Sequence, residues 1–260
     1  MSEFLTDTAV TRQQEGWWRA NLAEGWTIGT IPNGGYLMAI AARVLANSLS
    51  HSDPVTITGH YLERCEVGPA ELHAEVIRQG RQFSTGSVRL LQQGRERVRF
   101  TATYADLAEQ TGVSFFDDKM PKVSLVENCI IPPRTLNFTH RVDIAYPPDY
   151  TKWFAGDENA AAEHVGYIQF ADKTPADLIA LIIFSDSFPP PIFNKFGPSG
   201  WVPTLELTVQ LRAKPAAGWL LARYRTRYAT NGLVEVDGEI WDANGQLVAL
   251  SRQLAKARIG

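Results

Sequence analysis

Residues 34–49, GGYLMAIAARVLANSL, decide the fold of this chain because they predict a helix that is apolar on most of its sides. Asn33, directly before them, is one of the residue types that cap the start of a helix. A helix with so little polar surface is stable in water only when other elements cover nearly all of it. The segments that follow are therefore expected to wrap around it.

Four stretches of strand character follow this helix, with turn residues between them. They cover residues 55–62, 71–79, 83–92 and 97–105. The turn residues Gly68-Pro69, Gly80 and Gly94 leave short connections, which favours an antiparallel meander. Such a meander can curl around the apolar helix.

A segment without periodicity divides the chain. Residues 106–137 are interrupted by prolines, and we expect them to form a linker over the surface. The predicted units on either side are an N-terminal unit of residues 1–105 and a C-terminal unit of residues 138–260.

The pattern restarts after the linker. Residues 174–177, Thr-Pro-Ala-Asp, predict the start of a second helix that runs through Ile183, with Thr174 as its cap. Strand candidates lie on both sides of it: residues 137–146 and 163–171 before it, and 204–212, 219–228, 233–242 and 246–257 after it.

A helix followed by four strands thus occurs twice, and Gln92-Gln93-Gly94 in the first copy aligns with Ala243-Asn244-Gly245 in the second. A curved antiparallel sheet wrapped around a central helix is the hotdog arrangement, in the α+β class. Two copies predict a double hotdog, whose sheets join edge to edge into one continuous sheet. An all-β sandwich or barrel would accommodate the strands but would leave two buried helices without a place.

The composition excludes several classes of protein. The 260 residues carry 25 Lys and Arg against 28 Asp and Glu, without a dense basic run, so no nucleic-acid partner is expected. The longest apolar run, residues 178–184, is too short to span a bilayer, and no signal-peptide pattern opens the chain, so we expect a cytoplasmic protein. Cys65 and Cys129 are expected to be free thiols, and the spacing of the five histidines predicts no metal site.

Asp186 is the strongest candidate for chemistry. It follows LIALIIFS, and Ile179, Ile182 and Ile183 share its side of the predicted helix, so the carboxylate should end an apolar stripe. Burial there would raise its pKa toward neutrality, as a general base near pH 7 requires. The alternative is an aspartate at a helix end that turns out to water.

Gln253 and Thr204 differ in what their strands predict. Gln253 alternates with Ala249, Ser251 and Ala255, a row of small residues typical of a sheet face that presses on a helix. An exposed strand glutamine is the alternative. For Thr204, strict alternation predicts a solvent-facing side chain, in line with Glu206.

The start of the first helix can serve a ligand or only the fold. The backbone N–H groups of Gly34 and Gly35 can bind an oxyanion, because nothing shields them and helix N-termini favour negative charge. The alternative is that Asn33 caps the helix and the glycines allow tight helix packing.

The chain resembles the acyl-CoA thioesterase II-like family of double-hotdog proteins. In the first half, PNGGYLMAIAARVL, HYLERCEVG and RQGRQFSTGSVRLLQQGR carry the resemblance. In the second half, SDSF, PTLELT and GQLVALSRQ fall where family members carry an Asp, a Thr and a Gln that hold the attacking water. The resemblance therefore implies that Asp186, Thr204 and Gln253 form the catalytic site. Residues 211–215, LRAKP, depart from the family's pattern and affect the expected substrate pocket.

The resemblance also implies an activity: hydrolysis of an acyl-CoA thioester to a free acid and CoA, without a cofactor. Arg78 and Arg81 are the leading candidates to meet the CoA phosphates, and Arg64, Arg225 and Arg227 are further ones. The alternative for each of them is a solvated strand residue. Because hotdog sheets commonly join edge to edge, two or more chains are expected to associate as a homo-oligomer.

Two other functions remain open from the sequence. An enoyl-thioester hydratase or dehydratase would depend on His60, and a non-catalytic acyl-CoA or lipid binder would keep only the pocket. In the repeat, Ala102 matches Gln253, and the first helix has no acidic residue. The sequence thus predicts one site per chain, with its polar side chains from the second half.

Overall fold

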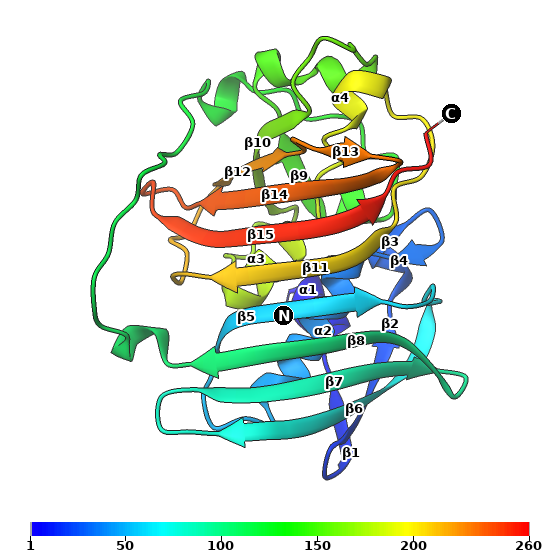
Figure 1. Cartoon of the computed structure of the whole chain (residues 1–260), viewed down its shortest axis with the longest axis vertical. Helices are drawn as coiled ribbons and strands as arrows, with labels where there is room; N and C mark the ends of the chain where they lie inside the picture. Colours follow the sequence, from blue (N-terminus) through cyan, green and yellow to red (C-terminus); the bar gives the residue numbers. More distant parts are fainter. Residues whose placement is uncertain (1, 260) are drawn as a thin grey trace.

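The computed structural model describes residues 2–259, in which one curved antiparallel sheet carries helices on one face (Figure 1). The helices are α1 (Glu3–Asp7), α2 (Gly34–Ala46), α3 (Leu178–Phe184) and α4 (Phe193–Phe196). The strands before the linker are β1 (Thr11–Gln14), β2 (Trp17–Leu22), β3 (Thr27–Ile28), β4 (Ile31–Pro32), β5 (Asp53–Tyr61), β6 (Gly68–Gln79), β7 (Ser84–Gln92) and β8 (Arg95–Ala105). Those after it are β9 (Val142–Ala145), β10 (Glu163–Phe170), β11 (Thr204–Leu211), β12 (Leu220–Arg225), β13 (Ala229–Thr230), β14 (Leu233–Trp241) and β15 (Leu247–Lys256).

The strand order in the sheet is β1-β2-β6-β7-β8-β5-β11-β15-β14-β12-β10-β9, with β13 beside β14, while β3 and β4 form a separate hairpin. The predicted α+β class with an antiparallel sheet is confirmed. The eight strands expected after the two helices are all present, with ends shifted by a few residues. Across residues 2–259, no helix combines the length and the apolar character that crossing a membrane requires.

Helix α2 is the centre of the core. Ten of its 13 residues are buried, which agrees with its apolar sequence. Asn33 caps it, because the Asn33 side chain accepts a hydrogen bond from the Tyr36 N–H. The helix ends at Ala46, three residues before the apolar stretch does.

Helix α3 is shorter than expected. Its cap is Asp177, whose carboxylate accepts the Ala180 N–H at 2.7 Å, so the predicted start at Thr174 is wrong. Residues 174–176 precede the helix without regular secondary structure, since an aspartate three residues later offers the stronger cap.

The four strands before α2, β1 to β4, were not predicted from the sequence. In β2, Trp18, Ala20 and Leu22 are buried and alternate with less buried residues, a period-two signal that the pair of tryptophans obscured. The strand predicted over residues 137–146 is confined to β9, because a 3-10 turn occupies Phe138–His140.

The two halves meet along β5 and β11, which pair antiparallel. Thr58 pairs with Thr208, and their hydroxyl oxygens lie 2.8 Å apart. Corresponding residues on the two strands face each other there, as at a two-fold axis. The registers agree, because Ile57 pairs with Ala102 in the first half and Leu207 pairs with Gln253 in the second. The helices also meet, with Gly35 of α2 packed on Ile183 of α3.

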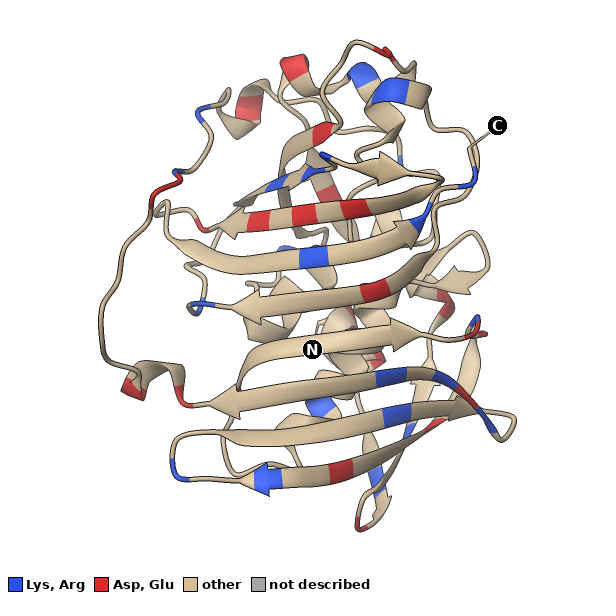
Figure 2. Ribbon diagram, viewed as in Figure 1, with Lys and Arg blue, Asp and Glu red and all other residues tan. Residues whose placement is uncertain are grey.

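Charged residues lie on the strands of both halves, and β14 in the second half carries a row of acidic residues (Figure 2). Arg223 and Arg225 of β12 pair with Glu239 of β14. Arg223 also pairs with Asp118 at 2.5 Å, which fastens the linker to the sheet.

Candidate active site

Asp186 lies two residues beyond the end of α3, where this end touches the start of α2. Its Oδ2 accepts hydrogen bonds from the Gly35 N–H at 2.9 Å and from Asn33 Nδ2 at 3.1 Å. Its Oδ1 accepts one from Gln253 Nε2 at 2.9 Å. Asn33 Nδ2 also donates to the Asp186 main-chain oxygen at 2.8 Å, so the first half of the chain holds a carboxylate of the second half in place.

The two glycines allow this contact. A Cβ on Gly35 would lie 2.9 Å from the Asp186 Cβ and 3.0 Å from the Ile183 Cα, and one on Gly34 would lie 2.9 Å from Asp186 Oδ2. All three distances are shorter than ordinary van der Waals contact. The two glycines therefore permit the tight packing of α2 on α3, and the oxyanion role predicted for them stays a prediction. The Gly35 N–H is not left open for a substrate oxyanion, since it already donates to Asp186.

Gln253 and Thr204 complete the cluster. Gln253 projects from β15 toward the helices, and its Nε2 donates to Asp186 and also to Thr204 Oγ1 at 2.7 Å. The prediction that Thr204 faces solvent is wrong. The pairing of β11 with β15 skips Leu205, and this β-bulge moves Thr204 to the same face as the buried Leu207.

Three atoms of the cluster can form further hydrogen bonds. Both hydrogens of Gln253 Nε2 are engaged, while Gln253 Oε1 and the Thr204 hydroxyl hydrogen have no partner among the described residues. Asp186 Oδ1 accepts only one hydrogen bond, and a carboxylate oxygen can accept two. A water between these groups could donate to Oδ1 and Oε1 and accept from the hydroxyl.

The environment of Asp186 tunes its acidity. Burial raises its pKa to about 6, against the hydrogen bonds from Gly35, Gln253, Asn33 and Gly34, which lower it. The donors and the positive end of the α2 dipole keep the buried carboxylate ionised at neutral pH. Asp186 is thus poised to take up a proton near pH 6, as a general base must.

Tyr61 is a neighbour of the cluster that the sequence analysis missed. Its hydroxyl donates to the Gly34 main-chain oxygen at 2.9 Å, and its ring packs on Gly34. Burial and the nearby Asp186 charge raise its pKa, so the hydroxyl stays protonated. The sequence offered one signal for Tyr61: it is the last residue of β5, the strand that pairs with the second half.

The structure does not bring Arg78 and Arg81 to the cluster. They flank the β6–β7 turn, beyond the end of β7 at which Ser84 pairs with Tyr104 of β8. Tyr104 in turn pairs with Pro54, at the end of β5 opposite Tyr61. A role for these arginines in binding CoA phosphates stays a prediction.

The other arginines have different surroundings. Arg225 donates to Glu239, and Arg227 pairs with Asp237, so their charges are already matched. Arg64 is exposed beside a cavity.

His60 is separated from Asp186 by the sheet. A Cβ on its neighbour Gly59 would meet Met38 of α2, so Gly59 faces the helices and His60 faces the outer side. His60 lies 3.8 Å from Glu206 on that side. The hydratase alternative therefore lacks its histidine at the carboxylate.

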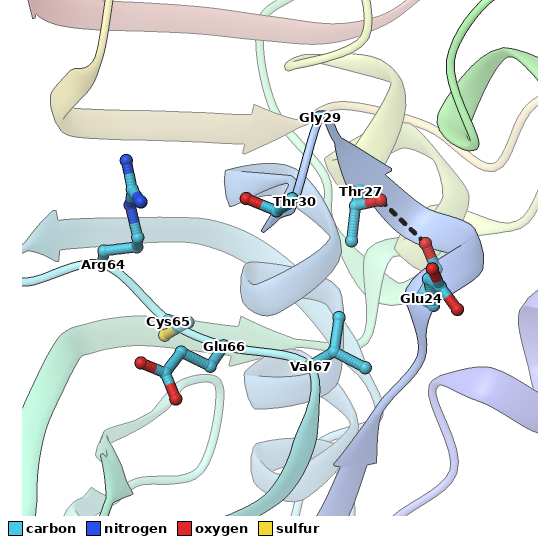
Figure 3. Close-up of a pocket in the computed structure, with 8 residues that line it drawn as sticks. All are labelled: Glu24, Thr27, Gly29, Thr30, Arg64, Cys65, Glu66 and Val67. Atoms are coloured by element: carbon cyan, nitrogen blue, oxygen red, sulfur yellow. Dashed lines mark hydrogen bonds between the residues drawn. The ribbon is translucent and has the colours of Figure 1, made fainter.

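A cavity of about 460 Å³ opens between the β3–β4 hairpin and the loop after β5 (Figure 3). Its lining is mixed: Thr27 and Thr30 on one wall, Cys65 and Val67 on the other, and charged residues at the rim. In the part of the chain that the structure describes, no group of three or more His, Cys, Asp or Glu side chains is placed to hold a metal ion.

Two family models match this chain. The model of the acyl-CoA thioesterase N-terminal domain matches residues 22–105, and the model of the C-terminal domain of the same proteins matches residues 117–256. Together they cover most of the chain, including Asp186, Thr204 and Gln253.

Individual proteins are similar over nearly the whole length. A Thermobifida fusca protein, provisionally assigned as a thioesterase II, is 30% identical and has a TM-score of 0.92, with 99% of this chain and 98% of that chain covered. A hotdog-fold protein of unknown function from Alicyclobacillus acidocaldarius is 20% identical, with a TM-score of 0.90 and coverage of 100% and 99%. The thioesterase-like protein TwmA of Talaromyces wortmannii is 25% identical, covering 92% of this chain and 87% of its own.

Proposed function

The chain belongs to the acyl-CoA thioesterase family, and from this premise we propose that it hydrolyses an acyl-CoA thioester to a free acid and CoA. One observation carries the proposal. A desolvated carboxylate, Asp186, is joined through Gln253 to Thr204, and the three leave a donor and two acceptors for one water. This arrangement supports water activation by a general base.

In the proposed reaction, the water gives a proton to Asp186 as its oxygen attacks the thioester carbonyl carbon. The tetrahedral intermediate then breaks its bond to sulfur, and the leaving sulfur takes the proton from the Asp186 carboxyl. One water is consumed for each acid and thiol released, and Asp186 returns to its ionised form.

The start of α2 would stabilise the oxyanion of the intermediate. In the resting molecule the N–H of Gly35 holds the Asp186 carboxylate. Once Asp186 has accepted a proton it is a weaker acceptor, so the amides of Gly34 and Gly35, the Asn33 amide and the helix dipole can act on the oxyanion. We therefore propose that these residues bind the oxyanion only after Asp186 has been protonated.

The test is to incubate the purified protein with acyl-CoAs from short to long and to follow thiol release. Asp186→Asn is expected to lose release by about a thousandfold, the scale of general base catalysis. Asp177→Asn is the matched control, because asparagine also caps a helix and Asp177 lies at the other end of α3. Binding of acyl-CoA without release by the parent protein would contradict hydrolysis and favour a non-catalytic binder.

We propose further that each helix with its part of the sheet is one hotdog unit, with bounds at residues 1–105 and 138–260 and the linker 106–137 between them. The Thr58–Thr208 pairing supports this double hotdog, because it relates corresponding strands of the two units. The cytoplasmic location and the homo-oligomer stay predictions.

A further inference from the structure

One peptide group links Tyr61 to the carboxylate of Asp186. The Tyr61 hydroxyl donates to the Gly34 main-chain oxygen at 2.9 Å. The nitrogen of that same peptide group belongs to Gly35, and its N–H donates to Asp186 Oδ2 at 2.9 Å. A hydroxyl of β5 and the carboxylate that follows α3 therefore lie at the two ends of one chain of hydrogen bonds.

The Tyr61 ring reaches this carbonyl because Gly34 has no side chain. A Cβ on Gly34 would lie 3.0 Å from both Cε1 and Cζ of the Tyr61 ring. The ring also meets Phe100 of β8 edge to face, with the two centroids 6.2 Å apart. Contacts with α2 and β8 thus hold the hydroxyl at the Gly34 oxygen.

A hydrogen bond accepted by a carbonyl oxygen polarises the whole peptide group, so that its N–H becomes a stronger donor. In a helix such an oxygen receives one bond, from the N–H four residues further on. The Tyr61 hydroxyl adds a second bond to the Gly34 oxygen. Because hydrogen bonds to charged acceptors are the stronger ones, a more polar Gly35 N–H favours the ionised form of Asp186.

Hydrogen bonds keep the buried Asp186 carboxylate ionised. The groups that lower its pKa are all donors, on Gly35, Gln253, Asn33 and Gly34. The charged residues of β11 and β15 that lie nearest in sequence, Glu206 and Arg252, belong to the outer face of the sheet together with His60. The strength of each donor therefore matters to the charge of Asp186.

The titratable groups that face Asp186 are two tyrosines, Tyr61 from β5 and Tyr224 from β12. Burial raises the pKa of both hydroxyls, with the nearby Asp186 charge acting in the same direction, so both stay protonated. Beside Tyr61, burial raises the pKa of the Cys65 thiol to about 12. Asp186 is thus the group of this cluster that titrates near neutral pH.

We propose that Tyr61 is a positioning residue: through the Gly34–Gly35 peptide it strengthens the hold of the Gly35 N–H on Asp186 and stabilises the ionised carboxylate. The inference rests on the proposed function. The same polarised N–H then acts on the oxyanion once Asp186 has taken up the proton. Tyr61 touches neither the water nor the thioester in this role, so it is not a catalytic residue.

The experiment measures the titration of the Asp186 carboxyl group by carbon NMR of protein labelled at its aspartate carboxyl carbons. The signal is assigned by its absence in Asp186→Asn. Tyr61→Phe removes the hydroxyl and keeps the ring, and we expect its midpoint about half a unit above that of the parent, because it loses a cooperative gain of ~10–30% on a hydrogen bond to a charged acceptor. The pH profile of kcat/KM for an acyl-CoA should move by the same amount.

Tyr104→Phe is the matched control. The Tyr104 hydroxyl donates at 2.7 Å to the main-chain oxygen of Ala42, further along α2. Ala42 follows the cap Asn33 by nine residues, as Asp186 follows the cap Asp177. The control therefore removes a similar hydroxyl where an alanine stands in place of the carboxylate. It should lower the melting temperature about as much as Tyr61→Phe and leave the Asp186 midpoint unchanged.

A raised midpoint in Tyr61→Phe alone supports the inference. An unchanged or lowered midpoint in that variant, or an equal rise in both variants, overturns it. If Tyr61→Phe does not fold, a fluorinated tyrosine at the same position of the full chain provides the test. Its hydroxyl is the stronger donor, so the midpoint should fall, and an unchanged or raised midpoint overturns the inference.

The NMR titration requires no turnover, so the two proposals fail separately. A parent protein that releases no thiol from any acyl-CoA contradicts the proposed function, and the midpoints still show whether Tyr61 acts on Asp186. A parent that releases thiol, with equal midpoints in the parent and Tyr61→Phe, keeps the hydrolase and overturns the role of Tyr61.

Discussion

Two influences of opposite sign act on the proton affinity of Asp186. Burial disfavours its charge, while four donors from α2 and β15 favour it, and the balance is a pKa raised to about 6. The same donors fix its orientation: Oδ1 accepts from Gln253, which also donates to Thr204, and Oδ1 keeps one lone pair free. A base of this kind is ionised at neutral pH and yet strong enough to accept a proton from water during attack.

The pH profile of the parent protein follows from that pKa. Because the base must be ionised, kcat/KM for an acyl-CoA should rise with pH, reach half its maximum near pH 6 and level off above pH 7. Steady-state rates between pH 4.5 and 8.5 measure it. A profile that is flat across this range would exclude Asp186 as the base.

Replacing Gln253 by Glu tests the contact between the amide and the carboxylate. A second carboxylate about 3 Å from Asp186 disfavours ionisation of both, so the midpoint of the pH profile should move up by more than one unit. The rate at pH 7 should fall accordingly. Gln210→Glu adds the same charge on the exposed face of β11 and should leave the midpoint where it is. The same midpoint in both variants would mean that Gln253 does not touch the base.

Helices and strands were predicted correctly from the local sequence pattern where each face of the element lies in one environment, either the core or solvent. α2 was predicted because nearly all its residues are apolar and buried, and β15 because Ala249 and Ala255 alternate under the helices. Thr204 was misassigned because one extra residue, Leu205, reverses the alternation, and only the pairing with β15 reveals that bulge. The role of Tyr61 was not predicted because it depends on a contact with Gly34, and no regular spacing in the sequence indicates that contact.

The contact of α2 with α3 has little tolerance for side-chain volume. Gly35→Ala adds a Cβ about 3 Å from Asp186 and Ile183, so the helices must separate. We expect a loss of about 1–2 kcal/mol in the free energy of unfolding and at least a tenfold loss in kcat, because the hydrogen bonds of Asp186 lengthen. Urea unfolding and initial rates measure the two effects.

Gly94→Ala provides the comparison. Its added Cβ meets nothing within 4 Å, and its φ of +72° strains the turn by about 1 kcal/mol. Stability should fall by that amount and kcat should not change. If both variants lost activity alike, the helix contact would not be what supports the site.

The two halves of the molecule are held together by direct contacts that do not involve the linker. β5 and β11 form five residue pairs, and α2 packs on α3. A protease recognition sequence inserted beside Val113, which is 97% exposed, should therefore be cut without separating the halves. Gel filtration should give one peak and thiol release should persist. Two peaks at micromolar concentration would show that the tether is needed for assembly.

The raised pKa of Asp186 also links stability to pH. Because the folded state binds this proton more tightly than the unfolded state, the contribution of Asp186 to stability is greatest below about pH 4 and is lost as pH rises through 6. Relative to Asp186→Asn, the parent should lose about 2–3 kcal/mol of unfolding free energy between pH 4 and pH 8. Denaturant unfolding at the two values measures the difference, and a parallel pH dependence in both proteins would contradict it.

Joining the two halves in one chain has a genetic consequence. In a symmetric dimer of separate chains, any mutation appears at both ends of the assembly, so a residue that improves one end also alters the other. Here Ala102 and Gln253 occupy related places in the sheet but are encoded separately. Each can mutate alone, and selection can favour catalysis at one end while the other is free to become a purely structural part of the core.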